Sequence, residues 1–71
     1  MTELVKFIKQ RRKQLGLTQP ELAKKAGVGL RFLRELEQGK ESLKMDKVND
    51  VLKLFGHELG PVKKMYRETE E

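Results

Sequence analysis

The sequence predicts a single all-α domain of four to five helices, followed by a short C-terminal segment that is either a strand or a tail. Three observations carry this prediction. Apolar residues recur at the spacing of a helix face over most of residues 4–55, glycines stand where these stretches end, and a chain of 71 residues has room for one small core. The helical domain is assigned to residues 1–56 and the C-terminal segment to residues 57–71.

The first predicted helix extends from Leu4 to Leu15 and has one apolar face and one basic face. Leu4, Ile8 and Leu15 form the apolar stripe, with Val5 and Phe7 beside it. Gly16 is placed to end the helix as a C-cap. The cations that interrupt the stripe are Lys6, Lys9, Arg11, Arg12 and Lys13.

The second predicted helix runs from about Gln19 to Ala26 and begins with a capping box. In this motif the Thr18 hydroxyl accepts a hydrogen bond from the Glu21 amide, and the Glu21 carboxylate reaches back to Thr18. Gly27 can adopt the positive φ that ends the helix.

The third predicted helix runs from near Gly29 to about Gln38. At about 100° per residue, Leu33 and Leu36 share the face that packs on the core. Phe32 lies between the faces, where it either packs at the edge of the core or contacts a partner. The face opposite the core carries Arg31, Arg34, Glu35 and Gln38.

The fourth predicted helix begins at Met45 or Asp46 and ends near Phe55, before Gly56. Its apolar residues follow the i, i+3, i+4 spacing and are expected to close the core over the first three helices. They are Met45, Val48, Val51, Leu52 and Phe55.

Charge is distributed unevenly along the chain. The formal net charge is +5, but residues 1–40 contribute +6 and residues 41–71 contribute −1. A basic N-terminal half indicates a polyanionic partner, nucleic acid first, although a solvated lysine-rich surface would give the same composition.

The composition also argues against several protein classes. There is no cysteine, so the chain has neither a disulfide framework nor a thiolate metal site. No apolar run approaches the roughly 18 residues of a membrane span, and the N-terminus lacks the apolar segment of a secretory signal. We therefore expect a soluble cytoplasmic protein with no membrane association.

Two short helices joined by a glycine-containing turn make a helix-turn-helix, here at about residues 18–38. The stretches LTQPELAKKAGV and LRELEQGK resemble the helix-turn-helix of the Xre family, which includes the phage lambda-type repressors and Cro proteins. The resemblance covers roughly residues 3–56. A second resemblance is to HipB-like antitoxins, the DNA-binding partners of HipA-type kinase toxins, and it is carried by the stretch GKESLKMDKVNDVLKLFGHEL. These resemblances imply a lambda-repressor-like fold.

The Xre resemblance implies that the third helix lies in the major groove of double-stranded DNA. Its base-contacting residues would be Leu30, Arg31, Arg34 and Glu35. An arginine can bond bidentately to guanine or clamp a phosphate, and Leu30 could contact a thymine methyl group. Glu35 has two interpretations: it accepts from cytosine N4, or it pairs with Arg31 or Arg34 and holds that arginine in place.

Phosphate contacts are expected from residues around the third helix. Gln19 matches the glutamine that bonds a backbone phosphate in the family, and Lys40 follows the helix directly. Lys9 and Lys13 are further candidates on the first helix. Gly29 occupies a phosphate-contacting position of the family, but it lacks the hydroxyl of the usual serine or threonine.

Arg12 and Glu37 match positions where the family carries an ion pair between the first helix and the end of the third. The alternative places Arg12 on a phosphate. Catalysis is not expected, because the single histidine, His57, and the single serine, Ser42, offer no convincing nucleophile and base pair. No metal site and no cofactor are predicted.

The sequence is interpreted as a dimeric transcriptional repressor that binds a palindromic operator. The resemblance implies the antitoxin and autoregulator of a HipA/HipB-like system, with a HipA-like kinase toxin as partner. The alternatives are a protein-interaction module that neutralises a toxin without binding DNA, and a phage-type immunity repressor. The homodimer interface is assigned to Val51, Phe55, His57 and Leu59, with His57-Glu58-Leu59 as the short strand.

Overall fold

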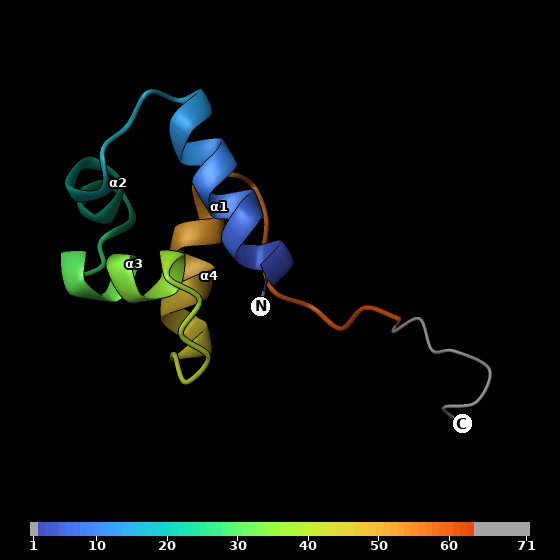
Figure 1. The fold of residues 1–71 in the computed structure, drawn as a ribbon. Helices are drawn as coiled ribbons and strands as arrows, with labels where there is room; N and C mark the ends of the chain where they lie inside the picture. Colours follow the sequence, from blue (N-terminus) through green and yellow to red (C-terminus); the bar gives the residue numbers. More distant parts are fainter. Residues whose placement is uncertain (1, 64–71) are drawn as a thin grey trace.

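The computed structural model describes residues 2–63 of the 71-residue chain. These residues form four helices and contain no strand, which confirms the predicted all-α class (Figure 1). The helices are α1 (Thr2–Gln14), α2 (Gln19–Ala26), α3 (Leu30–Glu37) and α4 (Met45–Lys53).

The ends of α2 are fixed by local hydrogen bonds that the sequence predicts. The Glu21 amide donates to Thr18 Oγ1 at 3.2 Å, and the Thr18 amide donates to Glu21 Oε1 at 2.8 Å. At the other end, Gly27 has a φ of 73°, and its amide bonds the carbonyls of the last helical turn. The turn between α2 and α3 is therefore set by a capping box before it and a left-handed glycine within it.

The core consists of eight buried apolar residues drawn from all four helices. α3 packs against both α2 and α1, and α2 also packs against α4. Half-buried side chains, among them Val28, Phe32 and Phe55, cover the edge of this core, so Phe32 does pack at the core edge. The buried residues are Ile8, Leu22, Ala23, Leu33, Leu36, Val48, Val51 and Leu52.

The structure corrects three expectations drawn from apolar spacing. Met45 and Leu15 were placed on core-facing stripes, yet they are 71% and 60% exposed, because each lies at the end of a helix where no neighbouring element covers it. Val51 was assigned to a dimer interface, but it is 0% exposed and belongs to the core of a single copy.

α4 also ends earlier than expected, at Lys53. Residues 54–56 form a turn in which the amides of Phe55 and His57 both donate to the Leu52 carbonyl, at 2.9 and 3.0 Å. Residues 57–63 then run without helix or strand, and Leu59 turns back onto the core, where its amide donates to Asn49 Oδ1 at 2.7 Å. The remainder of the predicted C-terminal segment lies outside the described residues.

Candidate nucleic-acid interface

α3 is held in place along one side and open to solvent along the other. Leu33 and Leu36 are fully buried beneath it. Gly29 is its N-cap, with extended backbone and no side chain to bond the first turn. The position of the helix therefore depends on burial and on the polar contacts at its C-terminal end.

Those polar contacts converge on Glu37, a carboxylate only 3% exposed. Arg12 donates to it through Nε at 2.8 Å and through Nη2 at 3.0 Å, and Gln19 Nε2 donates to it at 3.0 Å. The Arg12 Nη1 group donates to the Leu17 carbonyl at 3.0 Å. The predicted ion pair between Arg12 and Glu37 is therefore present and joins α1 to the end of α3. The Gln19 hydrogen bond adds the start of α2 to this contact.

The solvent side of α3 is polar and contains both arginines. Arg31 and Arg34 are exposed, and Leu30 is half-buried at the start of the helix. Arg31 Nε lies 3.5 Å from Glu35 Oε2, so the structure forms the predicted pairing of Glu35 with an arginine and selects Arg31 for it. The four residues predicted to face DNA bases thus lie on the first two turns of one helix.

Gln19 and Lys40 lie at opposite ends of the helix-turn-helix. The Gln19 side chain is half-buried, and its amide nitrogen has two N–H donors, of which the contact with Glu37 uses one. Lys40 Nζ lies 3.5 Å from Glu35 Oε2. The sequence did not predict either of these contacts with a carboxylate.

Beyond α3, the predicted Lys40 lies in a cluster with two lysines that the sequence analysis did not identify, Lys44 and Lys47. Lys40, Lys44 and Lys47 line an open hollow of about 320 Å³, together with Ser42. Lys44 is the N-cap of α4 and makes no side-chain cap, and the Lys47 amide donates to Asp46 Oδ1 at 2.9 Å. The signal was available, because three lysines occur within eight residues directly after the exposed helix.

Lys9 and Lys13 lie elsewhere on the surface. They line a hollow of about 300 Å³ with Lys6 and Gln10, all on the exposed side of α1. Within residues 2–63, no ion pair or side-chain hydrogen bond joins these two lysines to α3. Their role as phosphate contacts stays a prediction.

Of the remaining dimer candidates, Phe55 and His57 belong to an aromatic cluster with Phe7. The Phe7 ring meets the Phe55 ring edge-on at a centroid distance of 6.0 Å and the His57 ring at 4.6 Å. The Arg11 guanidinium lies 5.2 Å from the centre of the Phe7 ring. His57 is exposed, whereas Phe55 and Leu59 are half-buried against their own core.

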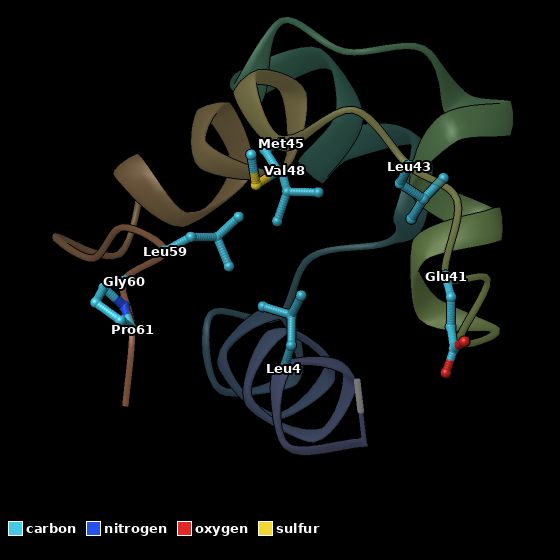
Figure 2. A pocket seen from close by; sticks show the side chains of 8 residues that line it. All are labelled: Leu4, Glu41, Leu43, Met45, Val48, Leu59, Gly60 and Pro61. Carbon is cyan, nitrogen blue, oxygen red and sulfur yellow. The ribbon is translucent and has the colours of Figure 1, made fainter. Parts of the chain in front are cut away.

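An apolar cleft of about 500 Å³ opens between the start of α1, the start of α4 and the C-terminal segment (Figure 2). Glu41 is the one charged residue at its edge. Val62, just beyond the cleft wall, is 88% exposed. The residues that line the cleft are Leu4, Glu41, Leu43, Met45, Val48, Leu59, Gly60 and Pro61.

Over residues 2–63, no helix combines the length and the apolar character needed to cross a membrane. The same residues contain no group of three or more histidine, cysteine, aspartate or glutamate side chains placed to hold a metal ion.

Comparisons with known proteins agree on the helix-turn-helix. The family model HTH_3, described as helix-turn-helix, matches residues 8–60. An uncharacterized HTH-type transcriptional regulator of Sinorhizobium fredii, y4mF, is 51% identical over 45 residues. That match covers 63% of this chain and 59% of the relative, so the chain spans less than two thirds of the relative's length. No solved structure matches the chain.

Proposed function

The chain belongs to the helix-turn-helix family HTH_3, and we propose that it is a sequence-specific DNA-binding transcription regulator that places α3 in the major groove. One observation carries the proposal. The solvent side of α3 holds Arg31 and Arg34 on a helix whose opposite side is fixed by Leu33, Leu36 and the Glu37 contacts.

The geometry supports a division of labour between base and phosphate contacts. A rigidly held helix can present an arginine to a base edge, where a bidentate contact discriminates between bases. Gln19 retains a donor for a phosphate at the start of α2. Lys40, Lys44 and Lys47 add positive charge on the far side of α3, where they would hold the protein in register without reading sequence.

The test is fluorescence anisotropy with a labelled duplex from the region upstream of the gene and a scrambled duplex of equal composition. Wild type is expected to prefer the upstream duplex by at least 10³-fold at physiological salt. The double variant Arg31→Ala/Arg34→Ala should lose this preference. Equal, weak binding of both duplexes by wild type would contradict the proposal.

The proposal extends to a repressor that occludes a promoter as a homodimer on a palindromic operator. A two-fold dimer would place two α3 helices about one DNA turn apart, roughly 34 Å. Support comes from the small core and from the apolar cleft, where Met45 is exposed. A second copy is the proposed occupant of this cleft.

Sedimentation equilibrium tests the dimer. Wild type is expected to sediment as a dimer, and Met45→Glu should raise the monomer fraction because it puts a charge in the cleft. The matched control is Leu15→Glu, which adds the same charge at an exposed apolar residue outside the cleft. A monomeric wild type at micromolar concentration, or equal effects of both variants, would remove the cleft from the interface.

The last part of the proposal is an antitoxin role, with a HipA-like kinase toxin as partner. It rests on the resemblance of residues 39–59 to HipB-like antitoxins. Co-expression with a kinase-like neighbour, followed by copurification and a growth assay, is the test. If the Arg31→Ala/Arg34→Ala variant still neutralises the toxin, toxin binding does not require DNA binding. If the wild-type protein fails to bind the kinase, the antitoxin role is excluded.

A further inference from the structure

The two exposed arginines of α3 have different surroundings. Arg31 Nε lies 3.5 Å from a carboxylate oxygen of Glu35, whereas Arg34 forms no ion pair with any carboxylate among residues 2–63. Helix geometry also separates them. Arg31 projects nearly opposite the buried Leu33 and Leu36, and Arg34 projects about 60° to one side. The two arginines are therefore not equivalent.

The carboxylate of Glu35 is held from two directions. Lys40 Nζ lies 3.5 Å from the same oxygen that Arg31 contacts. The Glu35 side chain is 29% exposed, against 92% for Arg31 and 47% for Lys40. A single exposed pair at this distance would be weak, but here the least exposed of the three groups is shared by both cations. This arrangement places both cations on one oxygen of the carboxylate, Oε2.

The contact at Nε leaves the end of the Arg31 guanidinium free. Arginine has five N–H donors in a planar fork, and one N–H of Nη1 and one of Nη2 form the end that points away from Nε. These two donors match the O6 and N7 acceptors of guanine in an end-on approach. A phosphate would also accept them, but its negative charge would lie close to the Glu35 carboxylate, whereas the guanine edge is neutral.

We propose that Glu35 is a positioning residue, which presents the terminal amino groups of Arg31 end-on to a guanine in the major groove. Arg34 has no such partner in the described chain and contributes mainly through phosphates, without regard to sequence. The inference rests on the proposed DNA-binding function and deepens it, because it assigns the base that is read and the side chain that sets the choice.

The experiment begins with a duplex selected by the wild-type protein from a random library. Each guanine of the selected site is then replaced in turn by 7-deazaguanine, which lacks the N7 acceptor. Wild type should lose about tenfold in affinity at one guanine of each half-site, and Glu35→Gln should reduce that loss to less than twofold. Glu35→Gln should also lower the preference for the selected over a scrambled duplex by about tenfold.

Three further variants separate positioning by Glu35 from the effects of charge alone. Glu58→Gln removes one negative charge from an exposed carboxylate that forms no ion pair among residues 2–63, and it should retain the wild-type sensitivity to 7-deazaguanine. Arg31→Lys keeps the charge without the planar fork and should lose that sensitivity. Arg34→Ala should weaken binding to selected and scrambled duplexes by the same factor.

The inference is overturned if Glu35→Gln keeps the wild-type response to 7-deazaguanine, or if Arg31→Lys does. It is equally overturned if Arg34→Ala is the variant that abolishes the response. These results differ from a failure of the proposed function, in which the wild-type protein would enrich no sequence from the library and both proposals would fall.

Discussion

Replacing Glu37 by alanine is expected to destabilise the fold by about 2–3 kcal/mol. Truncating one partner of a buried ion pair typically costs about 3–5 kcal/mol, because the other charge is left buried and unpaired. Here Arg12 keeps its hydrogen bond to the Leu17 carbonyl, and its side chain is 15% exposed, which lowers the expected cost. Gln19 also loses the acceptor that it bonds at 3.0 Å.

A loss of this size is large for a domain whose total stability is of the order of 4–10 kcal/mol. Urea unfolding followed by circular dichroism at a fixed protein concentration measures it. With a slope of about 1 kcal/mol per molar urea, the midpoint should fall by about 2–3 M. Glu58→Ala is the control, since it truncates an exposed carboxylate.

The double variant Arg12→Met/Glu37→Leu separates the cost of an unpaired charge from the net value of the pair. It should recover most of the lost stability, because apolar residues of similar size can replace a buried ion pair at little cost. An unchanged midpoint for Glu37→Ala would refute the reasoning, as would a double variant no more stable than the single one.

Three other predictions concern the turn, the helix cap and the lysine cluster. Gly27→Ala should cost about 1–2 kcal/mol in urea unfolding, since φ is 73° there although a Cβ would meet no atom within 4 Å. Gly29→Ala, at a φ of −71° and with equal space, should cost less, because it loses only the preference of an N-cap for glycine over alanine, and equal effects would contradict the backbone argument. The hydrogen bonds from the Thr18 amide and hydroxyl hold the pKa of Glu21 below its ordinary value of 4.5. The stability that they supply is therefore present above pH 4.5 and is lost as pH falls through the lowered pKa. Glu21→Gln should flatten the fall in the free energy of unfolding at acid pH, and an unchanged fall would contradict this role of Glu21. Lys44→Ala/Lys47→Ala should weaken binding to all duplexes alike and should reduce the magnitude of the slope of log affinity against log salt by about 2. An altered sequence preference would instead show that these lysines read bases.

Local sequence signals predicted most of the architecture. The capping box at Thr18 and the left-handed Gly27 form as expected, because both depend on residues that are adjacent in the chain. The contact between Arg12 and Glu37 is not local, and it was accessible only through the resemblance to the Xre family. The part played by Gln19 in the same network had no signal, because one amide can bond a carboxylate or a phosphate equally well.

Periodicity was less informative about where the core ends. Val51 follows the same spacing as Val48, so the pattern could not separate a residue facing its own core from one facing a second copy. Met45 continues the stripe to the start of α4, but no neighbouring element covers it there. The pairing of Glu35 was predicted only as a choice between two arginines, although its i,i+4 spacing from Arg31 already favours that residue over the adjacent Arg34. The contact with Lys40 depends on the loop after α3 and had no such signal.

The most direct test of the DNA-binding surface is a solution NMR titration of the isotopically labelled protein with the upstream duplex. We predict that the largest amide shifts occur at the start of α2, along residues 29–35 and at residues 40–47, and that the Arg31 and Arg34 side-chain signals shift with them. Shifts confined to the apolar cleft around Leu4 and Pro61, or to the lysines of α1, would contradict the assignment of α3 as the DNA-reading helix.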